Sequence, residues 1–390
     1  MDEAPATGEL TPPDRTLMGP GPSEVHPRVL RAMSTPLVGH LDPAYLEVMD
    51  EVQELLRYVF RTDNETTLAV SGTGSAAMEA AIGNLVEPGE RVLLRTKGYW
   101  GDRMAAMAER AGGEVVSLPT PANEPIDVAT VEAAFADEAI DVVGICHADT
   151  TTGIRQPRMA DITDVAHAHD AYVVADCVTS LGGVPVRVDE WGVDVAYSAA
   201  QKCLSAPPGA SPITVSDRAM EKIRGRETDP RSWYLDLSLL EQYWGDERAY
   251  HHTAPITTVY ALREALRLAA EEGIEARWER HREVAGELKA GVEAMGLEMN
   301  APDEHWLPSL NAVCVPDGVD DGAVISHLLD EYDLEIAGGL GGLSGEIWRI
   351  GCMGYSARRK NVEYLLSGLA DALAREGYDA DARTATASDD

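Results

Sequence analysis

Lys202 has an unusual setting for a charged side chain. Residues 198–209 read SAAQKCLSAPPG, so its neighbours in sequence are small, apolar or uncharged. An amine held away from water has a lowered pKa and is a good nucleophile, as in lysines that bond covalently to a carbonyl group. The alternative is a lysine whose stem lies along the surface while its amine reaches water, and for a lysine taken alone this alternative is favoured.

A glycine-rich turn precedes this lysine in the chain. The stretch SGTGSAA (71–77) follows a predicted strand and opens a predicted helix, and N–H groups at such a helix start can hold a phosphate. Its glycine spacing also fits a loose dinucleotide turn, although the next predicted strand (90–96) does not end in the acid that such a site needs. A tight turn that binds nothing is the third interpretation, and the motif alone does not choose among them.

Asp176 adds a carboxylate to the amine and the turn. It closes the apolar strand residues of VVADCV (173–178) and would face the carboxyl edge of a parallel sheet, where ligands bind. Taken alone, it is better explained as an acid that caps the following loop. Together, a phosphate anchor, an acid and an amine in this order are what pyridoxal phosphate requires for its phosphate, its pyridinium nitrogen and its aldehyde.

Two further side chains fit the same chemistry. Trp100, in GYWGDR after the second strand, could stack on a flat ring, or it could belong to the core. Arg349, placed by EIWRIG at the end of a predicted strand, carries a fork suited to a carboxylate, with a surface ion pair as the alternative. The histidine pairs at 251–252 and at 167 and 169 lack the partner spacing of a metal site, so we expect no metal.

The elements that must position these side chains alternate along the first half of the chain. Apolar strands and amphipathic helices in this order predict an α/β protein with a largely parallel sheet covered on both faces. The predicted strands are 66–72, 90–96, 114–119, 141–149, 171–178 and 194–200, and the predicted helices between them are 75–86, 101–112, 127–138 and 159–170.

Beyond residue 250 the pattern changes to two long helices, and the glycine at 273 between them is a plausible domain boundary. Strand-like runs at 309–316 and 346–351 and helices at 320–331 and 358–375 follow, which predicts a smaller α+β domain. We therefore predict an N-terminal arm (1–15), a large cofactor-binding domain (16–272), a small C-terminal domain (273–378) and a disordered acidic tail (379–390).

The charge balance restricts the partners and the compartment. Of 390 residues, 66 are acidic and 32 basic, a net charge of −34 spread along the whole chain. An acidic, strongly hydrated surface of this kind is typical of proteins in very salty cytosol and repels nucleic acid and anionic membranes, so we expect neither as a partner. Five cysteines without a CxxC pair, an N-terminus without an apolar core and no membrane-length apolar run predict a soluble, cytoplasmic protein with reduced thiols.

The chain resembles the class V aminotransferases of fold type I, specifically the alanine–glyoxylate and serine–glyoxylate group with its serine–pyruvate and ureidoglycine–glyoxylate members. The resemblance implies a large domain with a mostly parallel sheet of the seven-stranded type and a smaller C-terminal α+β domain. The matching stretches cover nearly the whole chain in order: LMGPGPSEVHPRVL (17–30), SGTGSAAMEAA, GYWGDR, HADTTTG (147–153), ADCVTSLGGVPVRVDEWGVD (175–194), SAAQKCLSAPPG, SWYLDL (232–237), YHHTAP (250–255) and EIAGGLGGLSGEIWRIGCMGYSA (335–357).

The resemblance also implies roles around the cofactor ring. Lys202 would hold pyridoxal phosphate covalently through its amine and would then move a proton as general base and acid. Asp176 would pair with the pyridinium nitrogen and keep the ring an electron sink. Trp100 would stack on one ring face, Val178 would pack on the other, and Thr151 would lie near the 3′-oxygen.

The phosphate and the substrate take the remaining roles. The resemblance gives the phosphate four ligands from the same chain, namely Thr73, Gly74, Ser75 and Gln201. It adds two ligands from a second subunit, Tyr250 and Thr253, and therefore implies a homodimer. It places the substrate carboxylate on Arg349, with the backbone around Gly21 helping to close the pocket.

Three positions depart from the resemblance. HADTTTG carries threonines where serine is frequent, and Cys203 follows the lysine where alanine is frequent. Glu24 replaces a neutral residue in the GPGPS loop; it could favour an amino group, but we interpret it as part of the acidic surface.

The predicted activity is transamination by a ping-pong route. A small amino acid, alanine or serine, would give its amino group to a small 2-oxo acid, glyoxylate or pyruvate. Ureidoglycine–glyoxylate transamination is an alternative, and a same-fold lyase such as a cysteine desulfurase is less favoured because it needs a reactive loop cysteine. An NADP-dependent oxidoreductase stays open on the glycine turn alone, and a non-catalytic binding protein is hard to reconcile with Lys202 and Asp176 together.

Overall fold

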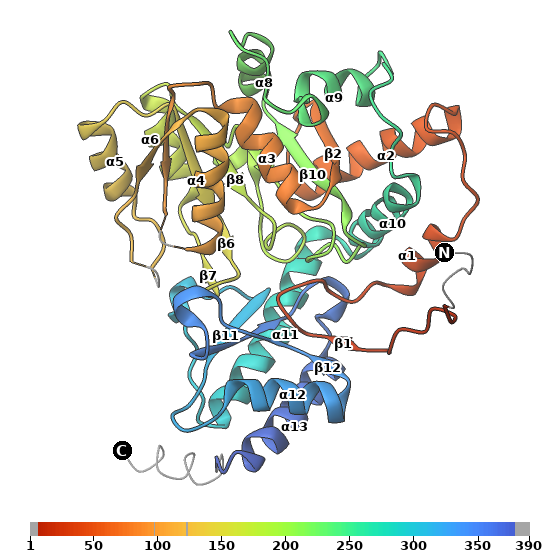
Figure 1. Cartoon of the computed structure of the whole chain (residues 1–390), viewed down its shortest axis with the longest axis vertical. Helices are drawn as coiled ribbons and strands as arrows, with labels where there is room; N and C mark the ends of the chain where they lie inside the picture. Colours follow the sequence, from red (N-terminus) through yellow and green to blue (C-terminus); the bar gives the residue numbers. More distant parts are fainter. Residues whose placement is uncertain (1–6, 97, 122–123, 379–390) are drawn as a thin grey trace, which may run out of the picture.

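The computed structural model describes residues 7–96, 98–121 and 124–378. The predicted tail (379–390) and the first six residues of the predicted arm lie outside the described residues. Figure 1 shows a large sheet with helices packed around it and, beyond helix α11 (Ile274–Ala294), a smaller group of strands and helices. The chain is therefore an α/β protein of the predicted class.

Within the described residues, the main sheet has seven strands in the order β2-β10-β9-β8-β5-β3-β4. All of them run parallel except β10, which is antiparallel to both of its neighbours. Their bounds are β2 (Thr66–Gly72), β10 (Gly209–Val215), β9 (Val195–Tyr197), β8 (Tyr172–Asp176), β5 (Val142–Cys146), β3 (Arg91–Leu94) and β4 (Glu114–Ser117). The central strands are buried on both faces, and their sequences are accordingly almost continuous apolar runs.

Strand β10 is absent from the sequence prediction. It follows the Pro207-Pro208 turn, which returns the chain between β2 and β9 in the opposite direction. Its sequence GASPITV contains a glycine and a proline, so it lacks the apolar run that identifies the other strands.

Helices surround this sheet, and their order in sequence agrees with the predicted alternation. Helices α2 and α10 pack against each other and against β10, while α3 packs on β2, β9 and β10. The bounds are α1 (Pro27–Met33), α2 (Pro43–Phe60), α3 (Gly74–Leu85), α4 (Tyr99–Ala111), α5 (Val128–Asp137), α6 (Met159–Ala168), α7 (Val188–Trp191), α8 (Asp217–Arg224), α9 (Leu237–Trp244) and α10 (Ile256–Glu272).

The C-terminal part forms a second, smaller assembly. Its strands are ordered β11-β14-β13 and are antiparallel, and β1 pairs in parallel with β12. The bounds are β1 (Thr16–Leu17), β11 (Leu310–Cys314), β12 (Leu334–Glu335), β13 (Ala337–Gly338), β14 (Ile347–Gly351), α12 (Asp321–Tyr332) and α13 (Arg359–Arg375). A small hairpin, β6 (Ala148–Asp149) with β7 (Ile154–Arg155), lies beside the main sheet.

The buried side chains fall into two main clusters. One runs from Val29 to Trp278 and fills the main sheet and its helices. The other joins Met18 to residues 284–378. The predicted boundary at residues 272–273 stays a prediction. Within α11, Trp278 belongs to the first cluster and Val284 to the second. No helix in the described ranges is both long and apolar enough to span a bilayer.

Candidate active site

Lys202 is a half-buried lysine that lies just beyond the carboxyl end of β9. Its Nζ donates a hydrogen bond to the carbonyl oxygen of Pro20. Burial lowers the pKa of this amine to about 8, and the positive charge of Arg349 acts in the same direction. The structure therefore gives Lys202 the desolvated setting of a nucleophilic amine rather than that of a surface lysine.

Gly21 lies directly against this lysine. A Cβ atom at position 21 would be 2.7 Å from both Cδ and Nζ of Lys202, and the backbone has a φ of +115°. Only glycine adopts this φ without strain while leaving room for the lysine. The predicted involvement of the Gly21 backbone thus has a direct geometric basis at the amine.

Asp176 ends β8 and is 3% exposed. One carboxylate oxygen accepts the N–H of Val178 at 2.8 Å, and the other accepts the hydroxyl of Tyr197 at 2.9 Å. Burial raises the pKa of the carboxyl to about 6, although both hydrogen bonds lower it. The group therefore ionises near neutral pH and attracts a cationic partner strongly.

Tyr197 is a site residue that the sequence analysis missed. It lies directly opposite Asp176 in the β8–β9 pairing. Its hydroxyl and Asp176 both lie at the carboxyl edge of the sheet, where parallel strands end together. The predicted strand 194–200 contained the tyrosine. If this strand had been paired in parallel with the predicted strand 171–178, Tyr197 would have been placed beside Asp176.

The glycine turn enters the site at the start of α3. Thr73 is the N-cap residue and makes no capping hydrogen bond with its side chain. A Cβ atom at Gly74 would lie 2.9 Å from Cβ of Ala199 and 3.5 Å from Cγ2 of Val178. The turn therefore packs against the loop that carries Lys202 and against the predicted ring contact Val178.

A cation also faces this turn. Arg103, one turn into α4, donates to Oγ of Ser75 at 3.1 Å, and its guanidinium lies 4.9 Å from the ring centroid of Trp100. A helix start with unpaired N–H groups and a guanidinium beside it is suited to an anion such as a phosphate. The sequence analysis did not predict a role for Arg103.

Trp100 and the hairpin threonines form the next wall. The indole Nε1 of Trp100 donates to Oγ1 of Thr150 at 2.8 Å, which fixes the ring. Oγ1 of Thr151 and Oε1 of Gln201 are buried and have no hydrogen-bond partner within the described part of the chain. Unpaired buried polar atoms are costly, so these two predicted cofactor contacts are poised to receive a ligand.

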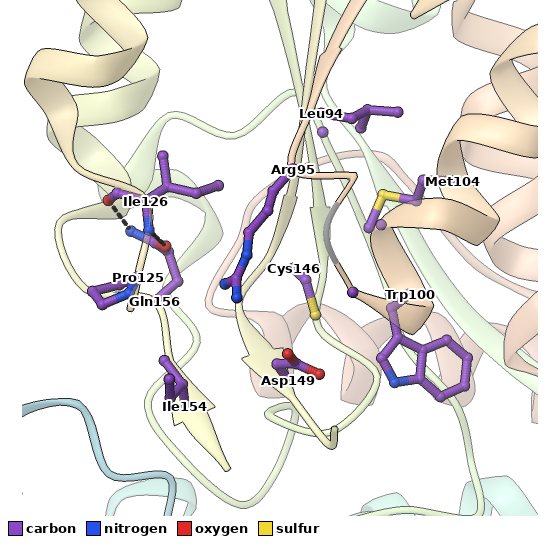
Figure 2. Close-up of a pocket in the computed structure, with 13 residues that line it drawn as sticks. Leu94, Arg95, Trp100, Met104, Pro125, Ile126, Cys146, Asp149, Ile154 and Gln156 are labelled. Atoms are coloured by element: carbon purple, nitrogen blue, oxygen red, sulfur yellow. Dashed lines mark hydrogen bonds between the residues drawn. The ribbon is translucent and has the colours of Figure 1, made fainter. Parts of the chain in front are cut away.

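A cavity of about 30 Å³ lies beside Trp100, between the ends of β3 and β5. Figure 2 shows Arg95, Asp149 and Trp100 extending toward this space. Neither Lys202 nor Asp176 lines it. A space of this size is too small for a cofactor, so it is not the reaction site.

Arg349 lies in the middle of β14, where it pairs with β11 and β13, and not at a strand end as predicted. The strand ends at Gly351, the last residue of the predicted run EIWRIG, so Arg349 lies two residues before its end. The side chain is 7% exposed, and its Nε donates to the carbonyl oxygen of Gly338 at 2.7 Å. Burial lowers the pKa of Arg349, while Asp149 opposes this.

Tyr250 and Thr253 lie on the surface, apart from the buried groups above. Tyr250 is 60% exposed and its ring centroid is 5.1 Å from that of His40. Between them, His252 contacts the glycine turn, because its Nε2 is 2.6 Å from Oγ of Ser71. The surface position is the one expected of residues that reach a second subunit, and it stays a prediction.

These groups fit pyridoxal phosphate. The largely desolvated amine of Lys202, the carboxylate of Asp176 and the helix start at Gly74 supply one partner each for an aldehyde, a pyridinium nitrogen and a phosphate. The unpaired hydroxyl of Thr151 can donate or accept a hydrogen bond, whereas the unpaired Oε1 of Gln201 can only accept, so a contact of Gln201 with the phosphate would have to come from its amide nitrogen. A seven-stranded, mostly parallel sheet with this site at its carboxyl edge defines a pyridoxal-phosphate-dependent enzyme of fold type I.

Comparison with known proteins gives the family. Residues 18–350 match the family described as aminotransferase class-V. The chain is 40% identical to alanine–glyoxylate aminotransferase of Mus musculus over 93% of this chain and 89% of that protein. The crystal structure of alanine–glyoxylate aminotransferase from Nostoc sp. superposes with a TM-score of 0.92 at 48% identity, covering 94% of this chain and 97% of that one. The chain belongs to the class-V aminotransferases and is a pyridoxal-phosphate-dependent enzyme.

A second solved structure is similarly close. Ureidoglycine–glyoxylate aminotransferase from Bacillus subtilis superposes with a TM-score of 0.93 at 40% identity, covering 98% of this chain and all of that one. A NifS-like protein shares the fold at only 16% identity. The overall similarity thus includes two named activities and does not choose between them.

Proposed function

We propose that this enzyme transfers the amino group of alanine or serine to glyoxylate or pyruvate by a ping-pong route. The observation that carries the proposal is the largely desolvated amine of Lys202, with a pKa lowered to about 8, near the buried carboxylate of Asp176. The names of the relatives from Mus musculus and Nostoc sp. support alanine and glyoxylate as substrates.

The protein's own residues would divide the work as follows. Pyridoxal phosphate, when bound, supplies an electron sink and carries the amino group between the two halves of the reaction. The amine of Lys202 would remove and return the proton at the substrate Cα. Asp176 would hold the ring nitrogen protonated, and Trp100 and Val178 would hold the ring between them. Arg349 would bind the carboxylate common to both substrates.

The cysteine desulfurase alternative finds no suitable thiol. Burial is the largest cause that raises the pKa of each of the five cysteines. For Cys203, beside the lysine, it raises the pKa to about 11. A desulfurase nucleophile needs an accessible thiolate. Ureidoglycine transamination stays the closer alternative, because the Bacillus subtilis enzyme has the same overall similarity.

A panel of amino donors tests the activity. We expect alanine or serine to convert the cofactor's visible absorbance to that of its aminated form, and glyoxylate or pyruvate to restore it. Ureidoglycine belongs in the same panel, since faster conversion with it would favour the alternative. No spectral change with any donor, in a protein that binds the cofactor, would contradict transamination.

We also propose a cytoplasmic homodimer with a salt-adapted surface. Trp233, Tyr234 and Tyr250 are exposed by 62%, 42% and 60%, and Trp233 stacks on His251 at 4.3 Å. Exposed aromatic clusters of this kind are typical of interfaces. The cysteines form no disulfide, in keeping with a reducing compartment.

Association of two such chains should depend on salt. Each copy carries a net charge of −34, and raising the salt concentration from about 0.1 M to about 1 M shortens the Debye length from about 10 Å to about 3 Å. We expect the mass measured by light scattering to rise to two chains with added KCl, and Tyr250→Ala to weaken cofactor binding. A single-chain mass with full activity at high salt would contradict the dimer.

A further inference from the structure

The segment from Met18 to Glu24 crosses the active site as a strap. At its first end, the N–H of Met18 donates to the carbonyl oxygen of Glu335 at 2.9 Å, and the N–H of Gly351 donates to the carbonyl oxygen of Met18 at 2.7 Å. Gly351 ends β14, the strand that carries Arg349. This end of the segment is therefore joined to the strand that would bind the substrate.

The middle of the segment lies on Lys202. Pro20 accepts the hydrogen bond from Nζ, and Gly21 packs against the lysine stem. Beyond them, the N–H of Ser23 donates to the carbonyl oxygen of Gln201 at 2.9 Å, and its hydroxyl donates to that of Lys202 at 2.7 Å. The position of this backbone thus determines how the amine is covered.

Glu24 fixes the far end of the segment. Its carboxylate forms an ion pair with Arg358 and accepts a hydrogen bond from Nδ2 of Asn361 at 3.1 Å. Its N–H donates to Oγ of Ser356 at 2.8 Å. The side chain of Glu24 is 16% exposed and that of Arg358 is 24% exposed. The interpretation of Glu24 as part of the acidic surface is therefore wrong.

The surroundings favour a fixed geometry for this ion pair. Arg358 is the N-cap residue of α13, so the carboxylate of Glu24 lies at the positive end of a helix of 17 residues. The guanidinium of Arg358 also lies 4.0 Å from the ring centroid of Tyr355. An ion pair that is mostly shielded from water and held on both sides is screened less by salt than a surface pair.

We propose that Glu24 and Arg358 form a latch that positions the Pro20–Gly21 backbone over Lys202. Both are positioning residues, because they act on the substrate site through this backbone and through the β14 end of the segment. The predicted effect of the latch on substrate binding rests on the proposed function. Its predicted effect on the position of the Pro20–Gly21 backbone is independent of that function.

Hydrogen exchange in the cofactor-bound enzyme tests the latch directly. Glu24→Gln keeps the size of the side chain and removes its charge. Pro20 and Pro22 have no amide hydrogen, so the segment is followed at Met18, Gly19, Gly21 and Ser23. We expect these amides to exchange at least about fivefold faster, while those of β8 keep their rate. The matched control is Glu287→Gln in α11, which breaks an exposed ion pair with Arg359, the first residue of α13, and should leave both regions unchanged.

Kinetics separate a positioning role from a merely structural one. We expect Glu24→Gln to raise KM for the amino acid and for the oxo acid by a similar factor of about five, with a smaller change in kcat and an unchanged cofactor spectrum. Arg358→Gln should do the same, and the double variant should be no worse than either single one.

The outcomes are distinguishable. Wild-type exchange in residues 18–23 of Glu24→Gln would overturn the latch, and faster exchange with unchanged KM would overturn its positioning role. Arg349→Lys tests the proposed function separately: if it leaves KM unchanged for both substrates, the carboxylate assignment fails, while the exchange result still decides whether the latch exists.

Discussion

Replacing Lys202 with alanine should lower the rate of transamination by about 10³-fold or more. Pro20 and Gly21 lie directly against the lysine, so its amine is held in place at the site. The variant should also lose the visible absorbance of the lysine-bound cofactor. Stopped-flow measurement of the alanine half-reaction, with the cofactor in excess, checks the rate.

The controls distinguish a lost proton carrier from a damaged fold. Lys202→Arg keeps the charge, but its pKa is too high for it to act as a base, so its rate should be equally low. A small exogenous amine should restore part of the rate in Lys202→Ala, since the space of the side chain is left empty. Full turnover by Lys202→Ala would mean that the mechanism is wrong.

The setting of Lys202 could be inferred from its neighbours, but its partners could not. The apolar stretch around it predicted a side chain shielded from water, and the structure shows a half-buried lysine. Its contact with Pro20, however, joins segments 182 residues apart. Such a contact depends on how the two cores meet, which no local pattern encodes.

The fold was predictable where local pattern and tertiary environment agree. β2 has its predicted bounds of 66–72, because every residue from Thr66 to Val70 is buried and the sequence is correspondingly apolar. β10 was missed because its position in the sheet is set by its neighbours and not by its own composition. The same reason explains Glu24, since an acid in an acidic sequence looks like surface until Arg358 is placed beside it.

The site uses one physical effect in two directions. Burial lowers the pKa of Lys202 to about 8 and raises that of Asp176 to about 6, because a low-dielectric setting disfavours both charged forms. The pKa values of two groups that would be fully charged on the surface are thereby brought close to neutral pH. Each can then be tuned by a bound ligand, and such tuning is the usual reason for perturbed groups in an active site.

Asp176→Asn should separate activity from stability. The amide cannot hold the ring nitrogen protonated, so we expect the rate to fall by about 10²-fold or more, equivalent to about 2.7 kcal/mol of barrier. In the cofactor-free protein, the wild-type carboxyl has a pKa raised from 3.8 to about 6, so the folded state holds its proton more tightly than the unfolded state. Its favourable contribution is therefore present below about pH 4 and is lost as the pH rises to about 6.

Asparagine does not titrate and avoids this loss. Above about pH 6, the cofactor-free Asp176→Asn variant should be as stable as the wild type or more stable, by up to about 1–3 kcal/mol, because it buries no charge. Below about pH 4 this advantage should disappear. Urea unfolding of both proteins at pH 4 and pH 8, beside the half-reaction rate, measures the two effects. A variant that is less stable at pH 8 but not at pH 4 would show that the hydrogen bonds from Tyr197 and Val178, and not the buried charge, determine the energetics of this carboxylate.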